Sequence, residues 1–166
     1  MEMIIKCGIL TISDRSSRGE RADLSGPSLQ AKAQALGWQV LKMAIVPDEL
    51  DLIRSTLVSW ADSGVLDLLL TTGGTGFSPR DVTPEATQTV IQRPAPGLAE
   101  AMRQASLKVT PHAMLSRAIA GIRGRTLILN LPGSPKAALE NLEVVLPVLP
   151  HAVQLLRQDP GAEAGH

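Results

Sequence analysis

Two patterns of apolar residues alternate along the chain. Four runs of aliphatic and β-branched residues are typical of buried strands: residues 3–13, 39–46, 65–72 and 126–131. Between these runs, apolar residues recur three or four positions apart, as Ile53, Leu57 and Ala61 do, which predicts amphipathic helices. Strands that alternate with helices favour the α/β class. We therefore expect three α/β/α layers around a mainly parallel, Rossmann-like sheet.

Proline and glycine mark where the predicted helices begin and end. Helices are expected to begin next to Pro27, Pro84 and Pro135, because proline is well tolerated in a first helical turn. Gly37 suits the end of the first of these helices, since glycine adopts left-handed backbone angles at low cost. These boundaries predict short loops between strands and helices.

The composition narrows the possible functions. The 16 basic residues are balanced by 16 acidic ones, so no overall field attracts nucleic acid or an anionic membrane. Aromatic residues make up only 2%, which leaves no stacking surface for single-stranded nucleic acid. The single cysteine, Cys7, excludes a disulfide framework, and no apolar run approaches the ~20 residues of a transmembrane helix. Without a signal-peptide pattern, we expect a cytoplasmic protein with one domain over residues 1–158 and a flexible tail over residues 159–166.

A glycine-rich loop follows the third predicted strand. Ligands of open α/β folds bind at the carboxyl ends of the strands, so the turns after the predicted strands are candidate sites. In this turn Gly73, Gly74 and Gly76 can point backbone N–H groups inward as a nest for an anion. Known nucleotide motifs do not match, because Phe77 stands where a P-loop needs lysine and Pro79 where GxGxxG needs glycine. On its own the loop is equally well explained as a turn that tight packing requires.

The turn after the last predicted strand has a similar layout. Ser134 can cap the helix that follows, and Lys136 lies in the first turn of that helix. A cation at a helix N-terminus opposes the helix dipole, which would make sense if an anion were bound between them. From this turn alone, a capped helix with a solvated lysine is the better interpretation.

Two aspartates also fall at the carboxyl ends of predicted strands. Asp48 follows Pro47 and could simply cap the next helix, and Asp81 could be a turn residue before Thr83. Two carboxylates beside a phosphate nest would repel the ligand unless a cation stood between them. Mg²⁺ is commonly held by one or two carboxylates together with substrate phosphates. The two aspartates therefore predict a metal–polyphosphate ligand.

Residues 71–87 resemble the signature of the molybdopterin adenylyltransferase family, of the MogA type and related to the G domain of gephyrin: TTGGTGFSPRDVTPEAT. Further segments are similar to the family in the same order: ISDRSSRGERADLSGPSL (12–29), VPDE (46–49), PGLAEAMRQASLKVTPHAMLSR (96–117), GIRGRTLILNLPGSPKA (121–137) and LPHAVQLLR (149–157). A lone GGTG is weak evidence. Its combination with VPDE and LPGSPK is highly specific, and the resemblance covers nearly the whole chain.

The resemblance implies a fold and an activity. Members of this family have a molybdopterin-binding, Rossmann-like fold, form homotrimers and need Mg²⁺. They transfer AMP from ATP to the terminal phosphate of molybdopterin and release pyrophosphate. A separate molybdenum-insertion protein then uses the product. No segment of this sequence matches that second activity, so one step only is expected of the chain.

The resemblance also implies roles for individual residues. The two critical aspartates of the family match Asp48 and Asp81, which are expected to act in catalysis and to hold Mg²⁺. Ser116, in MLSR, is expected to contribute to the ligand site, and Ser13 and Asp23 are expected to line it. The other expected contacts to substrate or nucleotide are Gly73, Gly74, Thr75, Gly76, Arg80, Thr83, Gly133, Ser134 and Lys136.

Three other functions remain open at this point. They are a paralogue that binds molybdopterin or nucleotide without transfer, a hydrolase of nucleotide pyrophosphates, and a trimeric scaffold. Because a phosphate nucleophile is already ionised near pH 7, no general base is needed, and His112 and His151 are interpreted as structural.

Arg15, Arg18 and Arg21 are interpreted as solvated residues of the first loop, with a phosphate-facing role left open for one of them.

Overall fold

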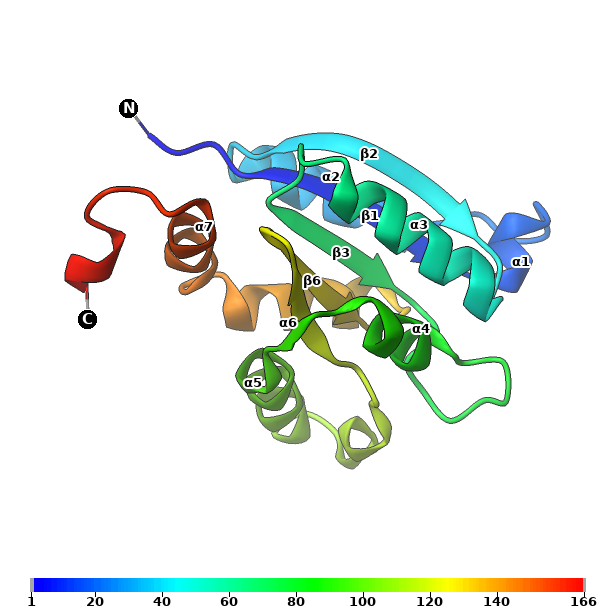
Figure 1. Cartoon of the computed structure of the whole chain (residues 1–166). Coiled ribbons are helices and arrows are strands. Elements are labelled where there is room, and N and C mark those ends of the chain that lie inside the picture. The colour runs from blue at the N-terminus through cyan, green and yellow to red at the C-terminus, as the bar shows by residue number, and fades with distance from the viewer. Residues whose placement is uncertain (1, 166) are drawn as a thin grey trace.

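A six-stranded sheet forms the centre of the computed structural model, which describes residues 2–165 (Figure 1). Its strands, in the order β2-β1-β3-β6-β5-β4, are β1 (Lys6–Ile12), β2 (Gln39–Val46), β3 (Leu68–Thr72), β4 (Arg93–Pro94), β5 (Ala120–Arg123) and β6 (Thr126–Leu131). Neighbours among β2, β1, β3 and β6 are parallel, while β5 pairs antiparallel with both β6 and β4. The expected mainly parallel sheet is confirmed.

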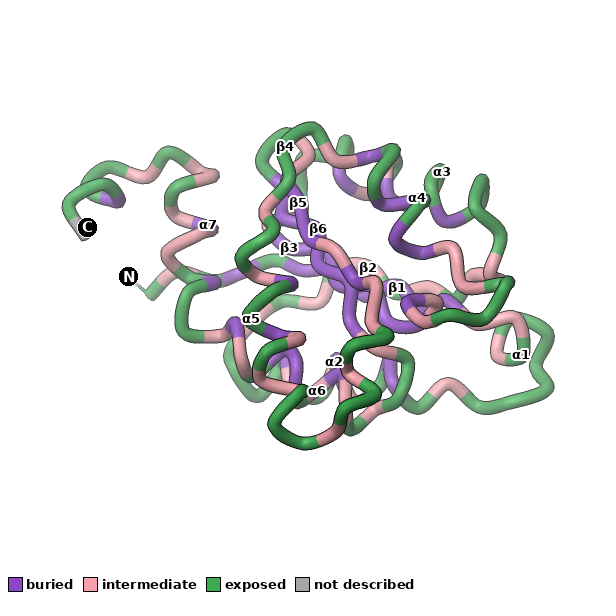
Figure 2. Tube along the Cα trace, turned by 90° about the horizontal axis from the view of Figure 1, so that it is seen from below, coloured by how far each residue is buried: buried purple, intermediate pink, exposed green. Residues whose placement is uncertain are grey.

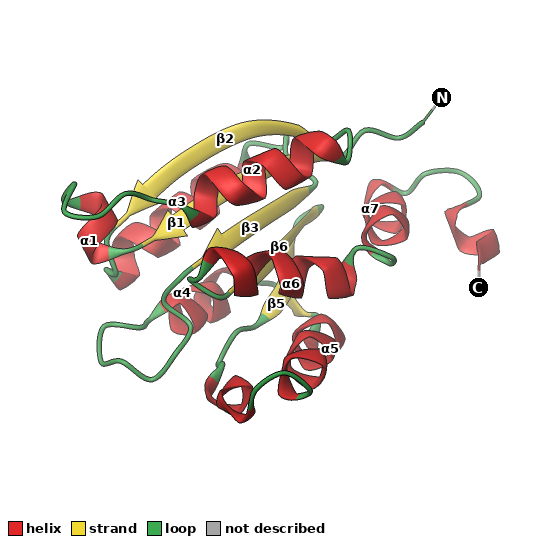
Figure 3. Ribbon diagram, turned by 180° about the vertical axis from the view of Figure 1, so that it is seen from behind, coloured by secondary structure: helices red, strands yellow, loops and turns green. Residues whose placement is uncertain are grey.

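Helices cover both faces of this sheet. Figures 1 and 3 show α3 and α4 on one face and α2, α5 and α6 on the other, as the predicted three layers require. The helices are α1 (Asp14–Ser17), α2 (Ser25–Ala35), α3 (Leu50–Asp62), α4 (Thr83–Val90), α5 (Pro96–Leu107), α6 (Pro135–Val145) and α7 (Leu149–Arg157), with 3₁₀ helices η1 (Pro111–Leu115) and η2 (Ala162–Gly165).

Each face of the sheet has its own hydrophobic core. Successive residues of the central strands point to opposite faces, so each strand supplies both cores. One core contains Ile9, Leu70 and Leu129, and the other contains Leu10, Leu69 and Ile128; all six are fully buried. Figure 2 shows the buried trace concentrated in these strands. Burial on both faces explains why the strands read as continuous apolar runs.

Most element boundaries lie where the sequence predicted them. Residues 39–46 and 126–131 are strands β2 and β6 as expected, and Gly37 has the left-handed φ of 78° expected after α2. Strand β3 begins at Leu68, three residues later than predicted. Strands β4 and β5 were not predicted, because β4 has only two residues and the β5 sequence AGIR lacks an apolar run.

The segment predicted to be a flexible tail has local structure. It contains η2, and Ala162 is buried. Its flexibility stays a prediction, and residue 166 lies outside the described residues. Within residues 2–165, no helix combines the length and the apolar character that crossing a membrane would need.

A buried asparagine ties β6 to the elements around it. Nδ2 of Asn130 donates to the hydroxyls of Thr71 and Thr87, each 3.0 Å away. Its Oδ1 accepts from the backbone N–H of Ile119 at 3.2 Å. The residues Asn130, Thr71 and Thr87 are all 0% exposed. This one side chain therefore links β6 to β3, to α4 and to the segment that leads into β5.

We expect Asn130→Ala to lower the free energy of unfolding by about 1–3 kcal/mol, because it leaves buried polar groups without partners. Chemical denaturation would measure the loss. Gln88→Ala, on the exposed side of α4, is the control and should change stability by less than ~0.5 kcal/mol. Equal stability of the Asn130 variant and the wild type would show that these hydrogen bonds do not support the fold.

Candidate functional site

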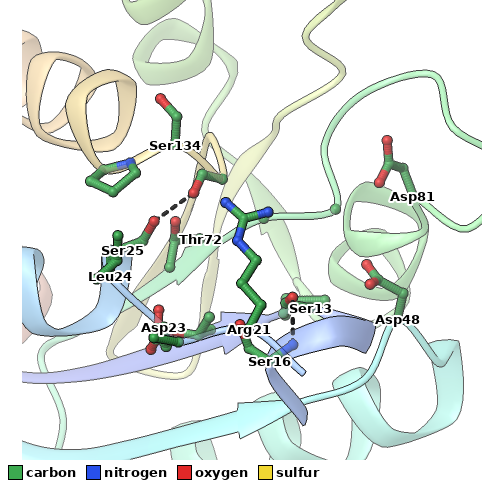
Figure 4. A pocket seen from close by; sticks show the side chains of 17 residues that line it. Ser13, Ser16, Arg21, Asp23, Leu24, Ser25, Asp48, Thr72, Asp81 and Ser134 are labelled. Carbon is green, nitrogen blue, oxygen red and sulfur yellow. Dashed lines mark hydrogen bonds between the residues drawn. The ribbon is translucent and has the colours of Figure 1, made fainter. Parts of the chain in front are cut away.

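The turns after β1, β2, β3 and β6 line a pocket of about 310 Å³ at the carboxyl edge of the sheet (Figure 4). The predicted site residues that line it are Ser13, Asp23, Asp48, Gly73, Gly74, Asp81, Gly133 and Ser134. The predicted site residues outside its lining are Thr75, Gly76, Arg80, Thr83, Ser116 and Lys136. The two candidate catalytic aspartates and the first half of the glycine loop thus share one pocket.

The glycine loop needs its first two glycines for steric reasons. Gly73 and Gly74 have left-handed φ angles of 103° and 68°. A Cβ atom on Gly73 would overlap the carbonyl oxygen of Ile12, and one on Gly74 would overlap the Thr83 hydroxyl. A Cβ on Gly74 would also lie 3.1 Å from Oδ1 of Asp48. Tight packing and a place beside the pocket are therefore both properties of this loop.

Thr83 braces the glycine loop from the start of α4. Its hydroxyl donates to the carbonyl oxygen of Gly73 at 2.9 Å, and its backbone N–H donates to that of Gly74 at 3.1 Å. Thr83 is 0% exposed. Its observed contacts are thus with the loop and support the loop's conformation.

Asp48 and Asp14 hold each other in place across two turns. The backbone N–H of Asp14 donates to Oδ2 of Asp48 at 2.9 Å, and that of Asp48 donates to Oδ1 of Asp14 at 2.9 Å. The N-cap residue of α3 is Glu49, which makes no side-chain capping bond. The alternative that Asp48 caps this helix is therefore wrong, because its carboxylate accepts a hydrogen bond from the backbone of the turn after β1 instead.

Arg80 joins the glycine loop to the same pair of turns. Its Nε and Nη2 donate to the two carboxylate oxygens of Asp14 at 3.0 and 2.9 Å, and Nη2 also donates to Glu49 at 2.9 Å. Because Arg80 donates to it, the Asp14 carboxyl has a pKa below its ordinary value. Arg80, which the sequence suggested as a phosphate contact, is paired with two carboxylates in this structure.

Asp48 and Asp81 come from different turns and both face the pocket, as Figure 4 shows. Oδ2 of Asp81 accepts from the backbone N–H of Ser78 at 3.1 Å. Partial burial raises the pKa of the Asp48 carboxyl, and the charges of Asp14 and Asp81 raise it further. Among the described residues, no three His, Cys, Asp or Glu side chains form a metal-binding group. A cation here would therefore rely on two carboxylates and on oxygens of its ligand.

The other side of the pocket is built from short polar side chains. Ser13 caps α1 by accepting from the N–H of Ser16 at 3.1 Å. Asp23 accepts from the hydroxyl of Thr11 at 2.8 Å and from the N–H of Gly26 at 3.0 Å. These bonds fix the turn after β1 and the start of α2, so Ser13 and Asp23 both shape the pocket.

The turn after β6 completes the pocket. Ser134 caps α6 by accepting from the N–H of Ala137 at 3.1 Å, as predicted. The hydroxyl of Ser25 donates to the carbonyl oxygen of Gly133, which ties α2 to this turn. Lys136 is 84% exposed at its side chain and lies 3.9 Å from Glu140 on the same helix. The Lys136 side chain is therefore solvated, as the sequence of this turn taken alone favoured.

Ser116 and the second half of the glycine loop belong to a neighbouring region. Ser116 lines a separate, largely apolar cavity of about 240 Å³ beside α5, η1 and α6, together with His112. The backbone N–H of Arg117 donates to the carbonyl oxygen of Thr75 at 2.8 Å, and its Nε donates to that of Gly76 at 2.7 Å. Arg117 thus ties the second half of the glycine loop to the segment that carries Ser116.

Several residues that line the pocket were not predicted from the sequence. They are Thr11, Ser16, Ser25 and Thr72, with Arg21 left unassigned between solvent and a phosphate-facing role. All lie in or next to the turns that follow β1 and β3. The rule that ligands bind at the carboxyl ends of strands could have pointed to them.

Comparison with known proteins identifies the family of the chain. Residues 8–151 match the family model described as "Probable molybdopterin binding domain". A molybdopterin adenylyltransferase of Helicobacter pylori (strain 26695) is 47% identical over 154 residues, which are 92% of this chain and 88% of that protein. The chain belongs to this molybdopterin-binding family.

Two further relatives extend the comparison. Gephyrin of Dictyostelium discoideum is 47% identical over 163 residues, covering 92% of this chain, but the chain spans only 23% of that protein's length. The crystal structure of the molybdopterin biosynthesis enzyme MoaB from Thermus thermophilus matches with a TM-score of 0.88 at 53% identity. The match covers 95% of this chain and 99% of MoaB.

We expect Asp48→Asn to raise the melting temperature at neutral pH by a few degrees. The pKa of Asp48 is higher in the folded chain than in the unfolded chain, so its ionised form opposes folding. The gain should be absent below the pKa of an unfolded aspartate, should grow as the pH rises, and should be complete above the folded pKa of Asp48. Thermal unfolding over a series of pH values measures it.

Asp14→Asn is the matched comparison, and it should change the melting temperature at neutral pH in the opposite direction. Arg80 lowers the pKa of Asp14, so ionised Asp14 supports folding above the unfolded pKa, and this support is lost as the pH falls through the folded pKa. The variant should melt earlier than wild type at neutral pH and together with it in acid. Shifts in the same direction for both variants at neutral pH would contradict this assignment of charges.

Proposed function

We propose that the chain is a molybdopterin adenylyltransferase that transfers AMP from ATP to the terminal phosphate of molybdopterin, in the synthesis of the molybdenum cofactor. One observation carries the proposal. Asp48 and Asp81, on separate turns, face one pocket beside the glycine loop. The Helicobacter pylori relative, which is named for this activity and matches over 88% of its length, supports the choice of reaction.

The reaction suits a pocket without a general base. An oxygen of the molybdopterin phosphate attacks the α-phosphorus of ATP, and the bond between that phosphorus and the oxygen of the β-phosphate breaks. Pyrophosphate leaves with the electron pair, and a new phosphoanhydride joins AMP to the pterin. The attacking phosphate is ionised near pH 7, so no side chain has to remove a proton. His112 lines the neighbouring cavity, in keeping with this account.

Mg²⁺ fits the donor set of this pocket. Mg²⁺ is usually held by one or two carboxylates together with substrate phosphates, and Asp48 and Asp81 would supply the carboxylates. Partial burial, together with the charges of Asp14 and Asp81, raises the pKa of Asp48, so a cation bound beside this carboxylate would be favoured. When bound, Mg²⁺ would offset the charge of the phosphates and of the leaving pyrophosphate.

The chain's own groups would position the two polyanions. Gly73 and Gly74 line the pocket, and their positions have no room for a Cβ, so bare backbone would face the phosphates there. The paired turns of Asp14 and Asp48 would fix the direction of the Asp48 carboxylate. Ser116 and its largely apolar cavity lie next to the loop and are a proposed place for the pterin end.

An assay of the purified chain tests the proposed activity. We expect adenylylated molybdopterin, detected by mass spectrometry, only when ATP, Mg²⁺ and freshly released molybdopterin are all present. Asp48→Ala and Asp81→Ala should each lower the rate at least about a hundredfold, because each removes charge that acts on the reacting phosphates. Asp51→Ala, an exposed residue in the first turn of α3, is the control and should retain the rate.

Other outcomes of this assay would favour the other candidates. Binding of molybdopterin without product would indicate a binding paralogue. Turnover of ATP without the pterin would indicate a hydrolase. Full activity of Asp81→Ala would refute the assignment of the metal to this pair of carboxylates.

We also propose a cytoplasmic homotrimer that passes its product to a separate molybdenum-insertion protein, as the family resemblance implies. Light scattering after size exclusion should give a mass of three times 17.6 kDa. A mass of 17.6 kDa across the micromolar range would contradict the trimer. The assay above is independent of this result, because it measures product rather than mass.

A further inference from the structure

The pocket has an unbalanced charge for a site that receives polyphosphates. Its described lining includes the carboxylates of Asp23, Asp48 and Asp81 and a single cationic side chain, Arg21. The proposed Mg²⁺ would offset Asp48 and Asp81, but phosphates far from the metal would still need a positive partner. A side-chain cation that meets the ligand is therefore expected in this pocket.

The two cations that the sequence suggested for this role do not line the pocket. The guanidinium of Arg80 donates to the carboxylates of Asp14 and Glu49, and Arg80 is outside the lining of the pocket. Lys136 is also outside the lining and lies near Glu140 with its side chain 84% exposed. Neither is placed to meet a ligand in the pocket.

Arg21 has the geometry that the other two lack. It lies on the loop between α1 and α2, and Figure 4 shows its side chain extending into the pocket, between Asp23 and Asp48 in that view. Among the described residues, its guanidinium makes no ion pair or hydrogen bond. By contrast, Arg18, three residues earlier on the same loop, is paired with Glu20, with Nε 2.9 Å from Oε1.

The acidic neighbour on the same loop also has its partners. The carboxylate oxygens of Asp23 accept from the hydroxyl of Thr11 and from the N–H of Gly26, and among the described residues no ion pair or hydrogen bond joins Asp23 to Arg21. An arginine fork that is exposed within a pocket, with its donors unused, is suited to bidentate binding of a phosphate group.

We propose that Arg21 binds a phosphate group of the ligand in this pocket. Naming that phosphate as part of ATP or of molybdopterin rests on the proposed function, whereas binding of a phosphate by Arg21 does not. Arginine supplies two parallel N–H donors to phosphate, so the contact would both attract the ligand and fix its orientation. Arg21 is then a substrate-binding residue that acts alongside the two aspartates.

Calorimetric titration of the full chain at constant Mg²⁺ tests this proposal. The probes are inorganic tripolyphosphate, ATP, adenosine and freshly released molybdopterin, and the variants are Arg21→Gln, Arg21→Lys and the control Arg18→Gln. We expect Arg21→Gln to weaken tripolyphosphate binding about tenfold or more, the size of a lost charge-assisted hydrogen bond. Arg21→Lys should recover part of the loss. Adenosine binding, and all binding by Arg18→Gln, should stay as in wild type.

Comparing ATP with molybdopterin shows which of the two molecules supplies the phosphate that Arg21 binds. Weaker binding of ATP assigns Arg21 to the nucleotide, and weaker binding of molybdopterin with unchanged ATP assigns it to the pterin phosphate. The proposal is overturned if wild type binds none of the phosphate probes, or if Arg21→Gln binds them all like wild type. Equal losses for adenosine and ATP would also overturn it, since they would indicate a disturbed pocket. Failure of wild type to form adenylylated product, with tripolyphosphate binding intact, would refute only the proposed function.

Discussion

Two carboxylates, Asp48 and Asp81, face the pocket to which the proposed function assigns phosphate groups, and this conflict of charge is the constraint on which the proposal depends. Asp48 is partly buried, and the negative charges of Asp14 and Asp81 add to the rise of its pKa. Such an arrangement opposes folding and gains from a bound cation. A ligand that brings Mg²⁺ with its phosphates would remove the conflict, and on the proposed function the two aspartates recruit such a metal–polyphosphate.

The parallel strands of the fold bring the residues of this site together. Because β2, β1, β3 and β6 are parallel, four turns meet at one edge of the sheet, and residues far apart in the sequence share a pocket. The turns are then locked to one another, by the mutual bonds of Asp14 and Asp48 and by the fork of Arg80. Gly73 allows the third turn to lie against the first without steric overlap.

The sequence predicted the features that depend on local chemistry. Buried strands, proline-marked helix starts and the cap at Ser134 follow from patterns within a few residues, and the structure has them. The shared position of Asp48, Asp81 and Gly73 at one pocket was also predicted, because the carboxyl ends of parallel strands meet at one edge of the sheet. The short strands β4 and β5 were missed because sheet pairing, rather than an apolar run, defines them.

What could not be predicted depends on contacts between distant side chains. Arg80 and Asp14 are 66 residues apart, so nothing in either segment indicates that the guanidinium is already paired. The same holds for the bond that draws Asp48 away from capping α3. From the sequence, Arg21 was interpreted as one of three solvated arginines. Only the folded loop shows that Arg21 lines the pocket whereas Arg18 pairs with Glu20.

The most direct test of the central claim is a crystal structure with Mn²⁺ and α,β-methylene-ATP, whose bond to the leaving phosphate cannot be cleaved. Anomalous scattering locates the metal without reference to activity. The account predicts one Mn²⁺ bound by the carboxylates of Asp48 and Asp81 and by phosphate oxygens of the nucleotide. A nucleotide bound in the pocket with no metal at these two aspartates would contradict it.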